Sequence, residues 1–168
     1  MPIERSALAL GLGAALLSTP AGAAAPSRIT QAPHEAHARA AMTLAEVASH
    51  VEPGATRLVD VKALLREDAE ALLADIDWSP LRLRRRYALS ASLVRLDTTS
   101  TGERTLAASC TVSAAVREVE SGKLLFIIEG HARAEDSAAS GARAERDALR
   151  AAVRGAVVAV PDALRRAL

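Results

Sequence analysis

The chain is poor in aromatic residues and has almost no cysteine. Its 168 residues contain one Trp, one Tyr and one Phe, and Cys110 is the only thiol. Binding of single-stranded nucleic acids depends on stacking against several aromatic side chains, so this class of protein is excluded, as are sugar-stacking proteins. A single cysteine excludes an internal disulfide bond. The fold must therefore be stabilised by packing alone.

An excess of charge of one sign is also missing. The 21 basic and 20 acidic residues leave a formal net charge of +1, which provides no electrostatic footprint for nucleic acid. We expect no nucleic-acid partner. The basic residues are nearly all arginine and alanine is used throughout, as is typical of a GC-rich genome, so a choice of Arg over Lys carries little functional meaning.

Residues 1–23 have the features of an export signal. A short polar start precedes the apolar run Ala7–Leu17, Pro20 breaks the run, and Ala21–Ala23 provides the small residues that signal peptidase requires. The run is too short to cross a bilayer. We therefore predict cleavage before Ala24, a periplasmic or secreted location and no transmembrane segment in the mature chain. No cysteine lies near the cut, so we expect no lipobox.

Residues 24–57 are predicted to be a flexible lead-in with a possible short first strand. Met42–Val47 is compatible with a strand or with a helical turn. His34 and His37 have the types and the spacing of a zinc pair on one helical turn. They lack a third ligand, and they are three positions apart, whereas the two histidines of zincins are four positions apart. A solvated polar linker is the preferred interpretation, and we expect no metal or cofactor.

Residues 58–168 are predicted to form a single α+β domain. Helical periodicity is clear in Leu58–Ile76, with Asp60 as its N-cap, and in Ala142–Ala159, after which Pro161 kinks or restarts the helix. Between the helices, alternation of apolar and polar residues predicts three strands. They are Arg86–Leu96, with a bulge or a strong twist where Val94 and Leu96 break the alternation, Leu106–Val116, and Leu124–Glu135 after a tight turn at Gly122.

These elements predict a three- to four-stranded, mainly antiparallel sheet with two amphipathic helices packed on one face. The covered face would carry the alternating apolar residues Leu89, Cys110, Val112, Phe126 and Ile128. Cys110 would be an inert core residue. If Met42–Val47 is a strand, it would join the sheet through the first helix as a right-handed crossover.

The strongest local charge cluster precedes the first of these three strands. It comprises Arg82, Arg84, Arg85 and Arg86, followed by Tyr87. With leucines between the arginines, the segment could dock on anionic lipid headgroups or on an acidic partner. A solvated strand entrance in an arginine-rich protein is the preferred interpretation.

His131 is the one residue for which a catalytic arrangement can be drawn. It lies between Glu129 and Arg133 on the outward face of its strand, and Ser109, Thr111 and Ser113 lie on the neighbouring strand. A hydroxyl, an imidazole and an acid are the components of a hydrolase triad. A flat exposed sheet face, however, provides no pocket that excludes water. We therefore predict no catalytic residue.

The order of these elements resembles a group of bacterial envelope domains. The residues that carry the resemblance are the Tyr87–Asp97 and Leu106–Val119 strands, the Ser121-Gly122-Lys123 turn and Gly130-His131-Ala132. The group includes the N-terminal domain of the Tol-Pal propeller protein and the outer-membrane lipoprotein that activates a penicillin-binding protein. The chain is also similar to small exported proteins of GC-rich Gram-negative bacteria. It lacks the lipidated cysteine of the activator and the propeller of the Tol protein.

The resemblance implies a non-enzymatic adaptor that presents a sheet face or edge to partner proteins. Our leading hypothesis is therefore a soluble periplasmic domain that works by contact with another envelope protein. One alternative is a binder of anionic envelope surfaces through Arg82–Arg86, and another is a small hydrolase that uses His131. The sequence leaves the partner and the oligomeric state open.

Overall fold

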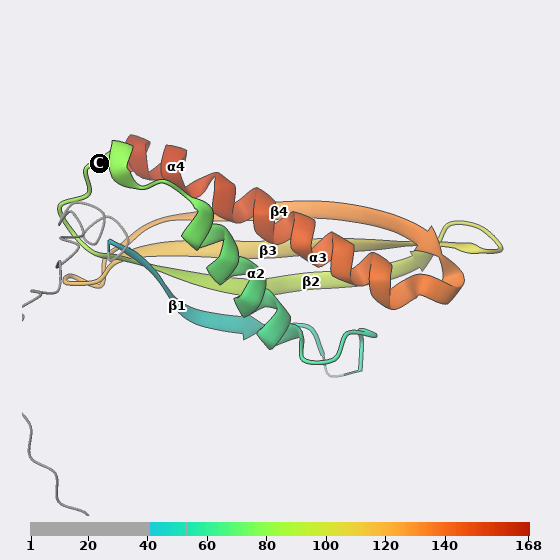
Figure 1. The fold of residues 1–168 in the computed structure, drawn as a ribbon. Helices are drawn as coiled ribbons and strands as arrows, with labels where there is room; N and C mark the ends of the chain where they lie inside the picture. The colour runs from blue at the N-terminus through green and yellow to red at the C-terminus, as the bar shows by residue number, and fades with distance from the viewer. Residues whose placement is uncertain (1–40, 53) are drawn as a thin grey trace, which may run out of the picture. The chain divides into compact units, whose positions relative to one another are not determined.

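The computed structural model describes residues 41–52 and 54–168 (Figure 1). The predicted signal peptide and the His34–His37 pair lie outside the described residues. The elements follow one another in the order β1 (Met42–Ser49), α2 (Val61–Asp75), η1 (Ser79–Leu81), β2 (Tyr87–Ser100), β3 (Thr105–Glu118), β4 (Leu124–Ser137), η2 (Ala138–Ser140), α3 (Gly141–Val158) and α4 (Val160–Ala167).

The four strands form one mixed sheet in the order β1-β2-β3-β4. The last three strands are an antiparallel meander, and β1 pairs with β2 in parallel. A parallel pair needs a crossover connection, which α2 provides. Figure 1 shows α2 and α3 on the same face of the sheet. The α+β prediction is therefore confirmed, and the segment around Met42–Val47, left open by the sequence, is a strand.

Alternation of side chains accounts for the meander. Residues that point to the helices, such as Leu89, Leu93 and Val112, are completely or almost completely buried. The register between β2 and β3 shifts between Leu93 and Arg95, and Val94 at this shift is 44% exposed. Of the two predicted alternatives, a bulge or a strong twist, the register shift favours the bulge. Gly122 has a φ of 66° in the tight turn before β4, a conformation that glycine adopts without steric cost.

Helix α2 begins after Asp60, whose side chain accepts a hydrogen bond from the backbone N–H of Ala63 at 3.0 Å. The predicted N-cap is confirmed, although the helix starts three residues later than Leu58. The buried residues of α2 are Leu65, Asp68, Ala69 and Leu73. The one charged residue among them, Asp68, forms an ion pair with Arg146 of α3 (Nη1–Oδ2 3.1 Å).

Helix α3 packs directly on the backbone of β4 at Gly130. An added Cβ on Gly130 would lie 2.0 Å from the carbonyl oxygen of Ala152 and 2.7 Å from the backbone nitrogen of Ala156. Both of these atoms belong to the helix backbone. The absence of a side chain at Gly130 therefore sets the distance between α3 and the sheet. On the helix side of the contact, a Cβ added on Gly155 would lie 3.7 Å from Gly130 Cα.

Cys110 lies in the core as predicted, with 2% of its surface exposed, and burial raises its pKa to about 12. The reactive form of cysteine is the thiolate. We therefore expect Ellman's reagent to leave the folded protein unmodified at mildly alkaline pH and to modify one thiol per chain once denaturant is added. Full reaction without denaturant would contradict the burial of Cys110.

Candidate functional site

A groove of about 800 Å³ lies between β1 and the C-terminal half of α2. Its apolar lining residues come from the strand, the helix and the segment that follows the helix: Met42, Leu44, Leu73, Ile76 and Trp78. Three carboxylates also line it: Glu70, Asp75 and Asp77. The groove therefore combines apolar surface with negative charge.

Two local interactions fix the end of this groove. The indole N–H of Trp78 donates a hydrogen bond to the carbonyl oxygen of Leu73 at 3.2 Å, and the Trp78 side chain is buried. The Asp77 carboxylate accepts a hydrogen bond from the backbone N–H of Ser79 at 3.0 Å. This bond, together with one from the Ser79 side chain, lowers the pKa of Asp77. Asp77 is therefore anionic at neutral pH.

Strand β1 borders the groove and lies at the edge of the sheet. The backbone N–H of Tyr87 donates to the carbonyl oxygen of Ala41 at 2.7 Å. Successive residues of a strand direct their backbone groups to opposite edges, so those of Met42 and Leu44 face away from β2. No strand within residues 41–52 and 54–168 pairs with this side of β1. An edge of this kind can accept a further strand.

A second groove, of about 450 Å³, contains most of the predicted arginine cluster. Basic residues from the β2 entrance and the β3–β4 turn line it, together with apolar residues and one carboxylate. The lining residues are Leu81, Arg82, Leu83, Arg84, Arg85, Tyr87, Glu118, Lys123, Leu125, Ala167 and Leu168. Tyr87 is 3% exposed, so only a small part of its surface reaches the groove.

The structure divides the arginine cluster into two pairs. Arg85 forms an ion pair with Glu118, and Arg86 forms one with Glu120 (Nε–Oε1 2.9 Å). A hydrogen bond from Ser121 and the contact with Arg85 lower the pKa of Glu118, and the Glu118 carboxylate raises the pKa of Arg85.

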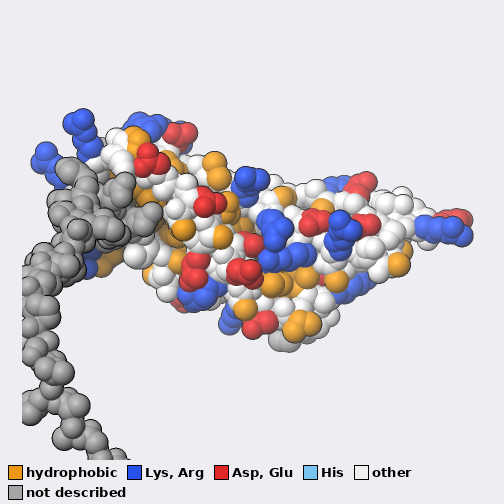
Figure 2. Space-filling view, viewed as in Figure 1, with side chains coloured by type: hydrophobic (Ala, Val, Ile, Leu, Met, Phe, Trp, Pro, Cys, Tyr) orange, Lys and Arg blue, Asp and Glu red, His pale blue; other side chains and the backbone are white. Residues whose placement is uncertain are grey.

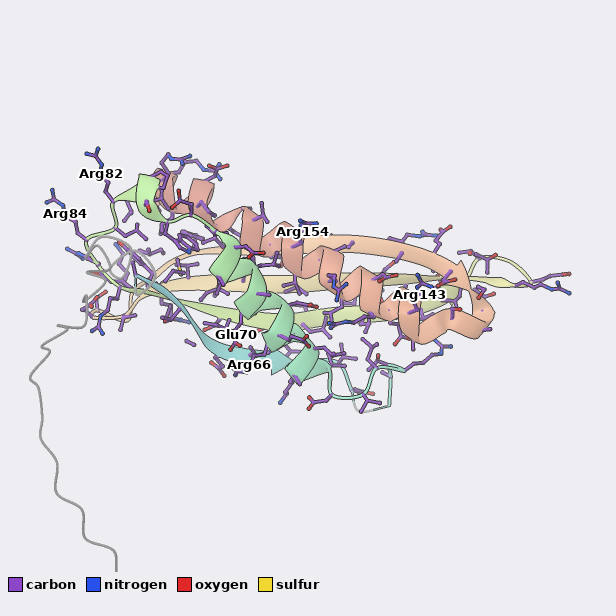
Figure 3. The ribbon with its side chains drawn as sticks, viewed as in Figure 1. Arg66, Glu70, Arg82, Arg84, Arg143 and Arg154 are labelled. Carbon is purple, nitrogen blue, oxygen red and sulfur yellow. The ribbon has the colours of Figure 1, made fainter. Side chains whose placement is uncertain are left out.

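Arg82 and Arg84 are exposed and have no ion pair among the described residues. Figure 3 shows both side chains extending away from the domain. Arg86 is the one predicted cluster residue that does not line the groove.

His131 lies on the uncovered sheet face, as predicted. Its Nδ1 is 3.1 Å from the hydroxyl oxygen of Thr111, and its Nε2 is 3.4 Å from a carboxylate oxygen of Glu129. The neighbouring hydroxyl is therefore Thr111, while Ser109 and Ser113 pair with other residues of β4. The His131 side chain is 63% exposed and lines neither groove. The His131 and Glu129 side chains are therefore both largely open to water.

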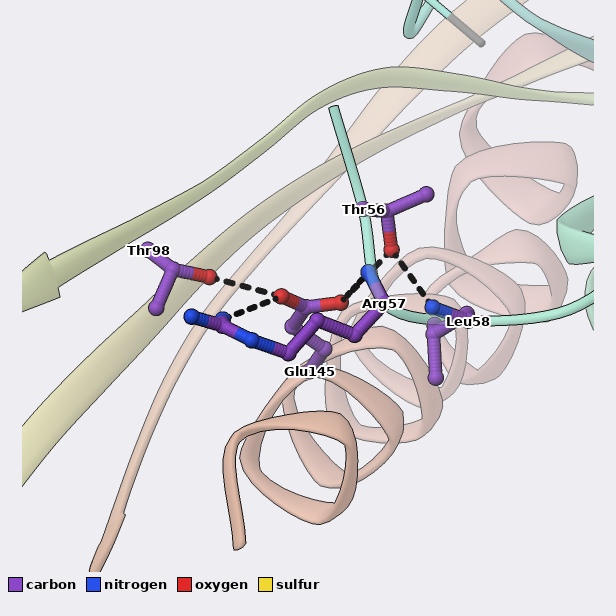
Figure 4. A network of polar contacts seen from close by, with 5 residues as sticks. All are labelled: Thr56, Arg57, Leu58, Thr98 and Glu145. Carbon is purple, nitrogen blue, oxygen red and sulfur yellow. Dashed lines mark hydrogen bonds and ion pairs between the residues drawn. The ribbon is translucent and has the colours of Figure 1, made fainter. Parts of the chain in front are cut away.

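Glu145 forms a buried polar cluster that the sequence analysis did not single out (Figure 4). Its carboxylate is 1% exposed and accepts hydrogen bonds from the Thr56 hydroxyl, the Arg57 backbone N–H, the Arg57 guanidinium and the Thr98 hydroxyl, at 2.6 to 3.0 Å. Burial alone would raise the pKa of Glu145, but these hydrogen bonds lower it overall. The cluster connects the loop before α2 to β2 and α3, so its role is structural.

Outside the two grooves, the visible surface has no patch in which all charges have the same sign. Figure 2 shows acidic and basic side chains interspersed over the helices. Among the described residues, none of the helices combines the length and the apolar character needed to span a membrane, and no group of three or more metal-ligating side chains comes together. The two grooves are therefore the candidate sites of the described domain.

Comparison with known proteins shows a shared fold. The chain matches no protein-family model and no curated protein. It is similar to the structure of a Xanthomonas campestris protein of family DUF330, with a TM-score of 0.51 and 12% identity over 74% of this chain and 85% of the other.

Two other matches are described as lipoproteins. A candidate lipoprotein of Caulobacter crescentus CB15 has a TM-score of 0.46 and 13% identity, over 77% and 91% of the two chains. A minor lipoprotein of Acinetobacter baumannii has a TM-score of 0.43 and 9% identity, over 72% and 93%. None of these three is a Tol-Pal protein or a penicillin-binding-protein activator, so that resemblance stays a prediction. The domain therefore has a mixed α+β fold that also occurs in the DUF330 protein.

Proposed function

We propose that the chain is a non-catalytic binding domain of the bacterial cell envelope that holds an extended segment of a partner protein between β1 and α2. The envelope location rests on the predicted export signal at residues 1–23. The observation that carries the binding role is the open edge of β1 beside a groove of about 800 Å³. These two features together match the requirements of strand addition.

Strand addition uses the backbone and the side chains of the ligand for different purposes. The backbone of an added strand would pair with the backbone groups of Met42 and Leu44 that face away from β2, which gives affinity. Alternate side chains of an extended peptide point to the same side, so every second residue would enter the groove. The apolar surface around Trp78 suits an aliphatic or aromatic residue there.

The carboxylates determine which segment fits best. Glu70, Asp75 and Asp77 line the groove. Glu70 forms an ion pair with Arg66 (Nη1–Oε1 3.4 Å), and the Arg66 side chain is exposed on the surface. An acidic partner segment would be repelled, whereas a basic residue next to an apolar one is attracted. The ligand we propose is therefore an extended, apolar segment that carries Lys or Arg.

A non-catalytic role is supported by the position of the reactive side chains. His131, the predicted alternative catalytic residue, lies on an open face with most of its surface exposed. The thiol of Cys110 is buried. Neither residue lines a groove, so the geometry offers no support for the hydrolase hypothesis.

A photo-crosslinking experiment tests this proposal. A photoreactive amino acid is placed at Ala74, which lines the groove, or at Ala63, another exposed position of α2 that lies outside the groove. Residues 24–168 carrying either change are irradiated in periplasmic extract. We expect adducts from position 74 but not from position 63, and mass spectrometry should map them to one apolar and basic segment of another protein.

Two results would contradict the proposal. Equal adducts from both positions would indicate nonspecific contact with α2. Adducts at position 74 that map only to residues 24–40 of the same chain would indicate that the chain itself fills the groove.

A further inference from the structure

The second groove is not used by the proposed function. We propose that it binds the headgroup and first methylenes of an anionic phospholipid and so docks the domain on a membrane surface. The inference is independent of strand addition, because β1 and α2 do not line this groove. It rests on three observations about the end of the sheet where β2 begins and β3 turns into β4.

The first observation is an excess of positive charge in the groove. The basic lining residues are Arg82, Arg84, Arg85 and Lys123, and Glu118 is the one acidic side chain among them. Glu118 already pairs with Arg85. Arg82 and Arg84 have no such partner in the described part of the chain, so their charges are available to a phosphate. Guanidinium groups bind phosphate oxygens in a bidentate manner.

The second observation is the apolar surface beside these charges. Leu81, Leu83 and Leu125 line the groove and are only partly buried, and they pack against the core on their other side. Two further apolar residues at the β3–β4 turn, Val119 and Leu124, are 44% and 40% exposed. A free phosphate would contact the arginines alone. A phospholipid would use both kinds of surface.

The third observation concerns the backbone of Arg82. Its φ is 46°, in the left-handed region where Gly and Asn are favoured over other residues. Backbone geometry alone therefore does not explain an arginine at this position. The long charged side chain of Arg82 extends away from the domain, as does that of Arg84 (Figure 3).

Vesicle co-sedimentation of residues 24–168 tests the proposal. Vesicles contain either a mixture of phosphatidylglycerol and phosphatidylcholine or phosphatidylcholine alone. We expect binding to the anionic vesicles only, with weaker binding at high salt because the interaction is screened. The double variant R82Q/R84Q should bind roughly 25-fold more weakly, since each basic residue near an anionic membrane changes affinity by about fivefold.

A matched double variant, R143Q/R154Q, removes the same charge from exposed positions on α3 (Figure 3). It should bind as the wild type does, because neither residue lines the groove. Equal losses in both double variants would mean adsorption by net charge alone and would overturn the proposal. Absence of binding to anionic vesicles, or equal binding to neutral ones, would also overturn it. Circular dichroism of each variant establishes that it is folded.

Discussion

Replacing Gly130 by alanine is expected to destabilise the domain by about 3 kcal/mol, the upper end of the usual cost of overpacking. The new Cβ would lie 2.0 Å from the Ala152 carbonyl oxygen, which cannot rotate away because it belongs to the backbone of α3. The helix would have to move off the sheet, and overpacking of this kind typically costs about 1–3 kcal/mol and occasionally more. Such a loss is a large part of the stability of a typical domain. Urea unfolding followed by circular dichroism measures it.

Gly155→Ala is the matched control for this experiment. Gly155 lies opposite Gly130 in the same contact, but its added Cβ would be 3.7 Å from Gly130 Cα, an ordinary van der Waals distance. Alanine is also favoured over glycine within a helix by roughly 1 kcal/mol. We therefore expect Gly155→Ala to be neutral or stabilising. Similar stabilities of the two variants would contradict the close contact between α3 and β4.

Replacing Glu145 by alanine is expected to destabilise the domain by roughly 3 kcal/mol. The carboxylate accepts four hydrogen bonds and is 1% exposed. Without it, the partly buried hydroxyls of Thr56 and Thr98 and the Arg57 backbone N–H lose their acceptor. A hydrogen bond of this kind contributes roughly 1 kcal/mol to stability, so three of them account for the expected loss. The exposed guanidinium of Arg57 contributes less because water solvates it.

A control for Glu145→Ala is Glu70→Ala. Glu70 forms an exposed ion pair with Arg66 four residues earlier on α2 (3.4 Å; Figure 3), and pairs of this kind contribute only a few tenths of a kcal/mol. We expect a change below about 0.5 kcal/mol for Glu70→Ala in the same urea experiment. A loss from Glu145→Ala no greater than that of the control would mean that the buried cluster does not stabilise the fold.

The Glu145 cluster also predicts a pH dependence. The pKa of Glu145 is lower in the folded protein than its ordinary value, so the unfolded chain binds more protons as the solution becomes acidic. The stabilisation is complete above the unfolded pKa, about 4.3, and is lost as pH falls through the folded pKa. The free energy of unfolding of Glu145→Ala should therefore depend less on pH below about 4.3 than that of the wild type. An unchanged acid dependence would contradict the lowered pKa.

Local patterns in the sequence determined the elements of this fold. Period-2 alternation identified β2, β3 and β4, including the irregularity near Val94, because adjacent side chains of a strand face opposite sides of the sheet. Helical spacing identified α2 and α3. Asp60 and Gly122 marked a helix start and a turn, because cap and turn conformations depend on the residue at a single position.

The tertiary structure decided which distant residues meet. The arginine cluster is local in sequence, yet its division into ion-paired and unpaired arginines depends on two distant carboxylates. They are Glu118 at the end of β3 and Glu120 in the turn that follows, and both lie beside the start of β2. Asp68 occupied an unremarkable position in α2 until Arg146, 78 residues later, was placed next to it. Glu145 interrupts an apolar stripe beside Leu149, a signal that could have identified a buried carboxylate but not its partners.

The groove beside β1 shows the same limit. Residues 42–47 fit either a strand or a helical turn, because so short an apolar segment has no clear period. Pairing with β2 made it a parallel edge strand, and the packing of α2 against it created the groove. The spacing of apolar residues along the chain determines whether a segment can form a helix or a strand. Which surfaces remain open depends on contacts between segments far apart in sequence, and only the folded chain contains them.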